Sequence, residues 1–199
     1  DINIKDKSRV VVGSVGELLP ALLPRKRVVV VSDTNIDRHY HSLIEPYDHV
    51  LIGLGEASKT LLTLDIIYRR VIELGVDRSC FVLAIGGGIV TDVAGFAAST
   101  FMRGLEFGFI STTLLGQVDA SVGGKTGINF GGLKNEIGVF NCAQSVLLDT
   151  TFLRTLDRQN LLSGYAEMIK HALISSTEDW AELMRFNLDQ VDYALLQQL

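Results

Sequence analysis

Short runs of apolar residues recur along the chain and predict the strands of a sheet. They lie at residues 9–13, 27–33, 49–54, 81–86, 107–112 and 145–149. The runs are almost continuously apolar and do not alternate with polar residues, which is typical of strands covered on both faces. We therefore expect an α/β fold with a largely parallel sheet that carries helices on both faces.

Segments with helical periodicity separate these runs, and the clearest is residues 58–74. One stripe of this helix holds Leu61, Leu64, Tyr68 and Val71. Ser58 is a possible N-cap and Gly75 is the expected C-cap. The repeated order of strand, helix and strand predicts a Rossmann-like domain.

The strands stop near residue 156, and the pattern is helical from Asp157 to Leu199. We therefore predict an α/β domain at residues 1–156 and the beginning of an all-helical domain at residues 157–199. The last segment has no Gly, Pro or Asn stop signal, so we expect the helical domain to be truncated.

Composition limits the classes of function. The chain has 199 residues, 47% of them hydrophobic, and a formal net charge of -5. Its basic residues are scattered, which argues against a nucleic-acid partner. No apolar run approaches the roughly 18 to 20 residues of a membrane helix, and the N-terminal segment lacks the apolar core of a secretory signal. We expect a cytoplasmic protein without a membrane partner, whose separated Cys80 and Cys142 are reduced.

Three glycines end one apolar run in the stretch AIGGGIVTDVAGF, residues 84–96. Gly86 and Gly88 fit the dinucleotide pattern G-x-G-x-x-G, but Thr91 stands at the third glycine position. Backbone N–H groups and the N-terminus of the following helix could hold a pyrophosphate there. The alternative is a plain glycine turn with Asp92 as a first-turn charge, and the triplet alone supports both about equally.

A second glycine-rich string, DASVGGKTG, nearly matches the P-loop. Asp119 replaces its first glycine, and a carboxylate at that place would repel phosphates. We therefore exclude a P-loop NTPase and interpret Lys125 as a lysine held at a glycine turn.

Two further pairs of polar residues follow predicted strands. Asp33 and Asn35 come after a buried run, where a carboxylate can accept hydrogen bonds from ribose hydroxyls, although capping of the next helix is the more common role. Glu56 and Lys59 stand where a helix starts and, taken alone, would be a cap and a surface charge.

The segment YAEMIKH places three polar residues on one helical face. Glu167, Lys170 and His171 are spaced i, i+3 and i+4. Such a face can bind a metal ion or can be an exposed charged surface, and the spacing does not distinguish the two.

The joint order of these motifs closely resembles the 3-dehydroquinate synthases of the sugar phosphate cyclase superfamily. The likeness is densest from Gly86 to Ile174 and includes LLDTTFLRTL and GYAEMIKHALI. It implies an N-terminal domain that binds NAD and a C-terminal helical domain that carries most of a zinc (or cobalt) site. By this resemblance, the NAD contacts are Asp33, Asn35, Glu56, Lys59, Gly86, Gly87, Gly88, Asp92, Thr112, Thr113, Lys125, Lys134, Phe152, Leu153, Arg154 and Thr155.

The resemblance also implies a lyase reaction. The family converts 3-deoxy-arabino-heptulosonate 7-phosphate into 3-dehydroquinate and phosphate in the shikimate pathway, by transient oxidation with NAD, phosphate elimination, re-reduction and an aldol closure. The residues implied for the substrate and for catalysis are Arg103, Asp119, Lys125, Asn135 and Lys170. The alternatives are 2-deoxy-scyllo-inosose synthase, another sugar phosphate cyclase, or a module that binds NAD without catalysis.

The metal site departs from the family pattern. Glu167 matches the family's zinc glutamate, but the two zinc histidines would lie beyond Leu199, and His171 matches no ligand position. We therefore expect this chain alone to lack a complete zinc site and to be inactive. The resemblance further implies a homodimer, in which Arg103 reaches the substrate of the neighbouring subunit.

Overall fold

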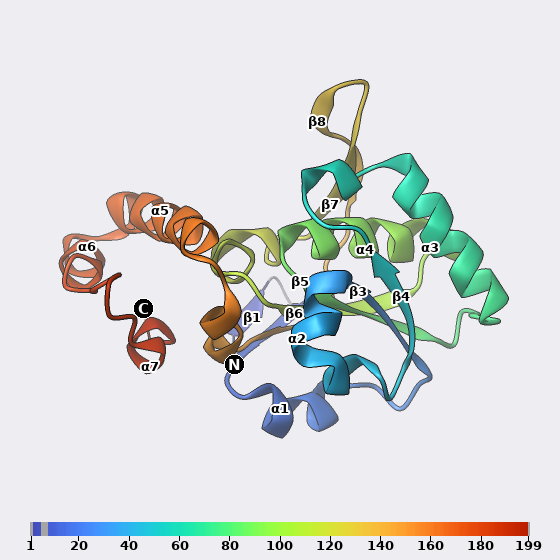
Figure 1. The fold of residues 1–199 in the computed structure, drawn as a ribbon, viewed down its shortest axis with the longest axis horizontal. Helices are drawn as coiled ribbons and strands as arrows, with labels where there is room; N and C mark the ends of the chain where they lie inside the picture. The colour runs from blue at the N-terminus through green and yellow to red at the C-terminus, as the bar shows by residue number, and fades with distance from the viewer. Residues whose placement is uncertain (1, 5–7, 199) are drawn as a thin grey trace.

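The computed structural model describes residues 2–4 and 8–198, and its centre is a seven-stranded sheet (Figure 1). The strand order is β1-β2-β9-β6-β5-β3-β4. Every pairing is parallel except that of β1 with β2. The strands are β1 Ile2–Ile4, β2 Ser8–Val12, β3 Val28–Asp33, β4 Asp48–Ile52, β5 Phe81–Gly86, β6 Glu106–Ser111 and β9 Ser145–Leu148. The predicted largely parallel sheet is confirmed, and β1 is a strand that the apolar pattern did not predict.

Helices cover both faces of this sheet, as predicted. Helices α3 (Leu61–Glu73) and α4 (Gly88–Thr100) pack on one face, and α1 (Val15–Leu22) and α2 (Thr34–Ile44) pack on the other. Successive side chains of one strand are buried in opposite cores, one on each face of the sheet. Val29 and Val31 of β3 belong to the α3/α4 core, and Val30 belongs to the α1/α2 core. This two-sided burial explains why the strands are apolar throughout.

The ends of α3 differ in part from the prediction. Thr60, not Ser58, is the N-cap, because its side chain accepts a hydrogen bond from a backbone N–H of the first turn. Gly75 follows the helix with φ +65°, the left-handed conformation that glycine adopts without strain. Leu61 is 50% exposed, and Ile67 takes its place in the buried stripe.

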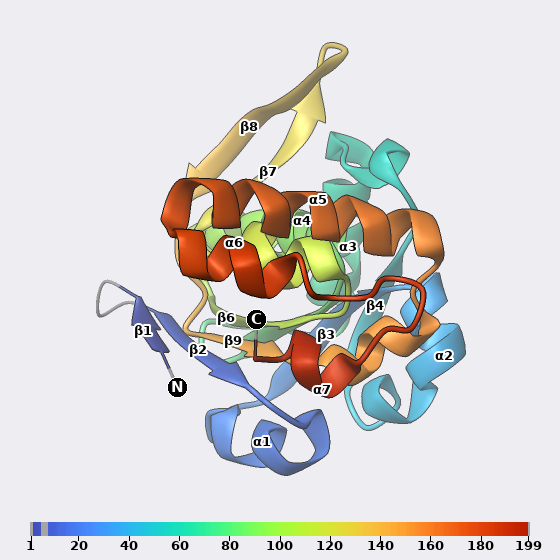
Figure 2. The same cartoon turned by 90° about the vertical axis from the view of Figure 1, so that its left-hand side faces the viewer.

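A β-hairpin projects from the body of the molecule (Figures 1 and 2). Its strands, β7 (Lys125–Phe130) and β8 (Leu133–Phe140), form a separate antiparallel sheet whose base packs on α4. The apolar pattern of the sequence predicts no strands here. The turn Gly131–Gly132 has φ of +60° and +81°, and a Gly-Gly pair between apolar residues is the signal that could have indicated the hairpin.

Helices α5 (Arg158–Ser175), α6 (Thr177–Leu183) and α7 (Tyr193–Leu196) follow the last strand and lie at one side of the sheet (Figure 2). They form a third core with Leu114 and Leu153 of the preceding chain. The proposed domain boundary near Leu156 stays a prediction. In the part of the chain that the structure describes, every helix is too short or too polar to cross a membrane.

Candidate functional site

A cavity of about 580 Å³ opens at the carboxyl ends of β3, β4, β5 and β6. The chain runs from β3 outward to β4 and then returns to place β5 on the other side of β3. Ligands of open α/β sheets bind at such a reversal of strand order. Many residues that the resemblance implied for NAD line this cavity: Asp33, Asn35, Glu56, Lys59, Gly87, Gly88, Asp92, Thr112, Thr113, Phe152 and Thr155.

The glycine loop brings the backbone to the cavity wall. Gly86 ends β5 and is buried, Gly87 is the N-cap of α4, and Gly88 is the first residue of that helix. Among the described residues, no side chain forms a capping hydrogen bond to the N-terminus of α4. Gly87 and Gly88 line the cavity, so the first backbone N–H groups of this helix lie at its wall. Gly87 has an ordinary φ of -77°, which any residue can adopt, so glycine is favoured here by the lack of room for a side chain. A Cβ atom there would lie 2.7 Å from Thr113 Cγ2.

The dinucleotide pattern has its third glycine at the position of Thr91, and in this chain a glycine, Gly95, lies one turn further along α4. Thr91 is fully buried and donates its hydroxyl to the Gly88 carbonyl at 3.1 Å. Of the two glycines in α4, Gly95 packs more closely, because a Cβ atom there would lie 2.5 Å from Thr126 Cγ2 of β7. The glycine that permits close packing thus stands at 95 in this chain.

Two polar residues of the cavity wall have contrasting roles. Asp33 caps α2, since one carboxylate oxygen accepts hydrogen bonds from Asn35 N at 2.9 Å and Ile36 N at 2.8 Å. The capping interpretation is therefore correct, and Asp33 lines the cavity as well. The Thr112 hydroxyl is buried and has no hydrogen-bond partner among the described residues. A buried hydroxyl of this kind is suited to a bound ligand that supplies its partner.

Lys59 is buried and not the surface charge that its local sequence indicated. It is 4% exposed, and its ammonium donates to Asp92 Oδ2 at 2.7 Å and to the Asn135 side chain. Burial raises the pKa of Asp92, and the hydrogen bond from Lys59 opposes that rise. The pair ties the loop after β4 to the first turns of α4.

A second cavity of about 580 Å³ lies beside the first. Asp119, Lys125 and Asn135, which the resemblance implied for the substrate, line it together. Asp92 lines both cavities and therefore marks their boundary. Gly123 and Gly124, with φ of +103° and +73°, precede Lys125, so the predicted glycine turn is confirmed, and Lys125 begins β7.

The structure does not bring every predicted residue to these cavities. Lys134 lines neither cavity, and its Nζ lies 4.0 Å from Glu56 Oε1. Leu153 belongs to the third core, and the Arg154 guanidinium lies 5.0 Å from the centre of the Tyr193 ring. Arg103 is on the turn η2 (Phe101–Arg103) and lines neither cavity.

Arg103 nevertheless has an unusual backbone. Met102 and Arg103 adopt φ of +49° and +68°, a region that costs energy for residues other than glycine. Such conformations cluster at functional sites, which motivates a functional hypothesis for this turn.

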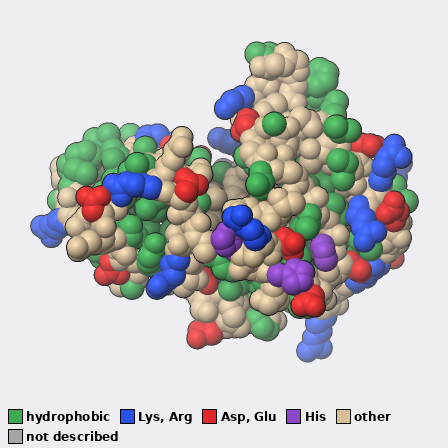
Figure 3. Space-filling view, in the orientation of Figure 1, with side chains coloured by type: hydrophobic (Ala, Val, Ile, Leu, Met, Phe, Trp, Pro, Cys, Tyr) green, Lys and Arg blue, Asp and Glu red, His purple; other side chains and the backbone are tan. Residues whose placement is uncertain are grey.

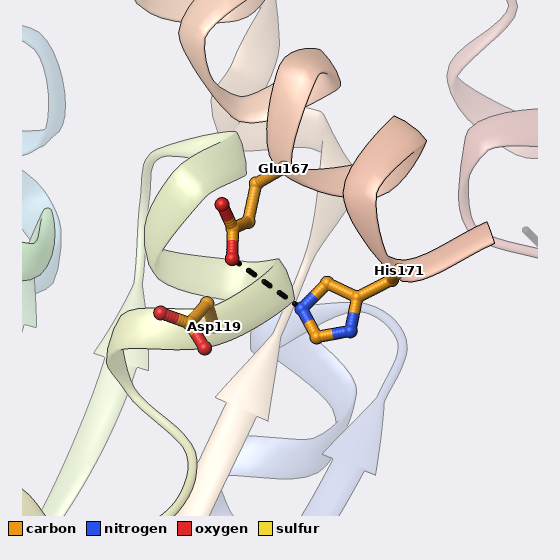
Figure 4. Close-up of side chains that lie close together, drawn as sticks. All are labelled: Asp119, Glu167 and His171. Atoms are coloured by element: carbon orange, nitrogen blue, oxygen red, sulfur yellow. Dashed lines mark ion pairs between the residues drawn. The ribbon is translucent and has the colours of Figure 1, made fainter. Parts of the chain in front are cut away.

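Glu167 and His171 point from α5 toward Asp119 (Figure 4). One ligand atom from each of the three lies within 4.8 Å of the others, and Glu167 Oε1 is 3.5 Å from His171 Nε2. Lys170 also pairs with Glu167, and this hydrogen bond raises the pKa of Lys170. Carboxylate and imidazole donors suit zinc and cobalt, so the set fits a divalent cation. The i, i+4 spacing indicated that Glu167 and His171 share one helical face, and the expectation that His171 is not a zinc ligand stays a prediction.

The outer surface is mixed in charge. Figure 3 shows acidic and basic side chains interspersed on this face of the molecule. The projecting hairpin carries exposed apolar side chains: Phe130, Leu133 and Phe140.

The comparisons with known proteins show the family of the chain. The family model for the 3-dehydroquinate synthase N-terminal domain matches residues 49–163, which include the glycine loop, the hairpin and the start of α5. The chain belongs to the 3-dehydroquinate synthase family. A 3-dehydroquinate synthase of Parabacteroides distasonis is 44% identical over 179 residues, covering 87% of this chain and 51% of that protein.

Solved structures of sugar phosphate cyclases share the fold. A 2-epi-5-epi-valiolone synthase from Streptomyces hygroscopicus, with NAD+ and Zn2+ bound, is 34% identical with a TM-score of 0.77, covering 86% of this chain and 51% of that one. A 2-deoxy-scyllo-inosose synthase complexed with carbaglucose-6-phosphate, NAD+ and Co2+ is 25% identical with a TM-score of 0.81, covering 94% and 56%. The chain thus spans about half the length of the relatives that it matches.

Proposed function

We propose that this chain is the NAD-binding part of a 3-dehydroquinate synthase, a lyase that converts 3-deoxy-arabino-heptulosonate 7-phosphate into 3-dehydroquinate and phosphate. The observation that carries the proposal is the pair of adjacent cavities, one lined by the residues implied for NAD and the other by residues implied for the substrate, with Asp92 between them. The family model and the cyclases solved with NAD+ and a divalent metal support it.

The first cavity is the proposed NAD site. The N-terminus of α4 and the backbone of Gly87 and Gly88 hold the pyrophosphate, and the orphaned Thr112 hydroxyl supplies a hydrogen bond. Asp33 and Glu56 line the same cavity and accept hydrogen bonds from the ribose hydroxyls. When bound, NAD provides a hydride acceptor and donor for a substrate hydroxyl, and a zinc ion provides positive charge beside it.

The second cavity is the proposed substrate site. Lys125 lies in its wall, and Lys170 lies beside Glu167 near Asp119, so both can supply positive charge to a substrate with a carboxylate and a phosphate. Asn135 orients the substrate by hydrogen bonding, and Glu167 is the proposed zinc ligand. Arg103 completes the site of the other subunit in a homodimer. We further propose that residues 157–199 begin a helical domain and that the protein acts in the cytoplasm.

The first test concerns the glycine loop. Gly87→Val is expected to weaken NAD binding at least about tenfold in a calorimetric titration, because its side chain occupies space at the cavity wall and displaces Thr113. The matched control is Gly16→Val on α1, where a Cβ atom meets nothing closer than 3.9 Å. A folded Gly87→Val chain that binds NAD as the wild type does would overturn the pyrophosphate assignment.

The second test separates the alternatives. A full-length family protein that contains this chain is expected to release phosphate from 3-deoxy-arabino-heptulosonate 7-phosphate faster than from glucose 6-phosphate, with NAD and zinc present. Preference for glucose 6-phosphate would favour 2-deoxy-scyllo-inosose synthase. NAD binding without turnover of any sugar phosphate would identify a non-catalytic module.

A further inference from the structure

The hairpin contains a bulge next to its Gly131–Gly132 turn. Ile128 of β7 pairs with Ile137 of β8, whereas Phe130 pairs with Leu133. Asn129 alone therefore stands opposite three residues of β8, Lys134 to Glu136. In the middle of this bulge Asn135 has φ +57°, a left-handed conformation that asparagine tolerates better than most residues.

Asn129 forms hydrogen bonds in three directions. Its backbone N–H donates to the Lys59 carbonyl at 2.9 Å. Its side-chain Nδ2 donates to Glu56 Oε1 at 2.7 Å, and its Oδ1 accepts from the backbone N–H of Asn135 at 2.9 Å. Asparagine alone among side chains of its length offers both a neutral donor and an acceptor, which this arrangement requires.

The hydrogen bonds of Asn129 hold the bulge so that the side chains of Lys134 and Asn135 lie near Glu56 and Lys59. The Asn135 side chain accepts from the buried Lys59 ammonium, and Lys134 lies 4.0 Å from Glu56. A bulge that lost the contact from Asn129 would no longer be held against the loop after β4, because the extra residues of β8 have no regular ladder partners there. Glu56, Lys59 and Asn135 would then lose a common support.

We propose that Asn129 is a positioning residue that fixes the β8 bulge and so holds the NAD-side residue Glu56 and the substrate-side residue Asn135 in one arrangement. Asn129 itself lines neither cavity. The inference about ligands rests on the proposed function, whereas the inference about the bulge does not.

The experiment measures two quantities on the 199-residue chain. Hydrogen exchange of the Asn135 backbone amide, followed by NMR without NAD, reports the bulge, and calorimetric titration with NAD reports the site. In Asn129→Ala we expect the Asn135 amide to exchange about tenfold faster and the Kd for NAD to rise about tenfold. The matched control is Asn141→Ala, which removes a side-chain hydrogen bond of 2.9 Å to Ser99 outside this network and should change neither quantity.

A second variant separates the two side-chain bonds. Asn129→Asp keeps an acceptor for the Asn135 N–H but places a carboxylate against Glu56, so we expect protected exchange at Asn135 and a raised Kd for NAD at pH 7. Unchanged Asn135 exchange in Asn129→Ala, or an NAD affinity equal to that of Asn141→Ala, would overturn the inference. A wild-type chain that does not bind NAD would overturn the proposed function, while the exchange result would still decide whether Asn129 holds the bulge.

Discussion

Replacing Lys59 by methionine is expected to lower the free energy of unfolding by about 2 to 3 kcal/mol at pH 7 and to remove measurable NAD binding. The Lys59 side chain is 5% exposed and its partner Asp92 is 21% exposed, so the substitution leaves a mostly buried carboxylate without its cation. Asp92 stands on the boundary of both cavities, so its displacement disturbs the NAD site directly. Chemical denaturation and NAD titration measure the two effects.

The stability loss in Lys59→Met depends on pH in a defined direction. Burial raises the pKa of Asp92, so the folded state holds this proton more tightly than the unfolded state. Protonated Asp92 therefore stabilises the folded state fully below the unfolded pKa of about 3.9. This stabilisation is lost as the pH rises through the pKa of Asp92 in the folded state. Lys59 opposes the rise in the pKa of Asp92, so removing Lys59 raises that pKa further and enlarges the loss of stability with increasing pH. The difference between wild type and variant should therefore grow from pH 4 to pH 8.

The matched control is Arg69→Met on α3. Arg69 pairs with Asp65 at 2.7 Å, but both side chains are more than half exposed. Water already solvates that pair, so its loss should leave the free energy of unfolding nearly unchanged. Equal losses in Lys59→Met and Arg69→Met would show that burial of the Lys59–Asp92 pair contributes nothing.

The sheet could be predicted from sequence because its strands are buried on both faces. A run such as VVVVSD is apolar at successive positions, and the structure divides Val29, Val30 and Val31 between two cores. The hairpin lacks this signal, since every residue of β8 is exposed or half-buried and the strand includes Lys134, Asn135 and Glu136. Its fold depends on the Gly131–Gly132 turn and on contacts to α4.

The polar contacts of the site were harder to predict because they join residues far apart in the chain. Lys59 follows the polar string GEAS and is buried only because Asp92, 33 residues later, and Asn135, 76 residues later, converge on its ammonium. A local pattern contains no information on either contact. The resemblance named all three residues, but not that they form one network or that Asn129 supports it.

Glu167→Ala is expected to abolish both zinc binding and turnover in a full-length family protein that contains this chain. A zinc site needs about three protein ligands, and Glu167 is the one that the family pattern assigns here. In the structure the Glu167 carboxylate also forms an ion pair with Lys170. Glu167→Ala therefore also removes the partner of the Lys170 ammonium, which the resemblance implies for substrate binding. Elemental analysis after dialysis measures the metal, and phosphate release measures turnover. Glu178→Ala on α6, an exposed position, is the control.

His171→Ala is expected to retain zinc and most of the turnover in the same protein. His171 and Asp119 are exposed, so water competes for any cation that they share with the half-buried Glu167. Two ligands from one turn of α5 and one exposed aspartate should bind zinc only weakly. The 199-residue chain is therefore expected to bind NAD yet hold no stoichiometric zinc after dialysis. One zinc per chain, lost in His171→Ala, would instead assign Asp119, Glu167 and His171 as a metal site of their own.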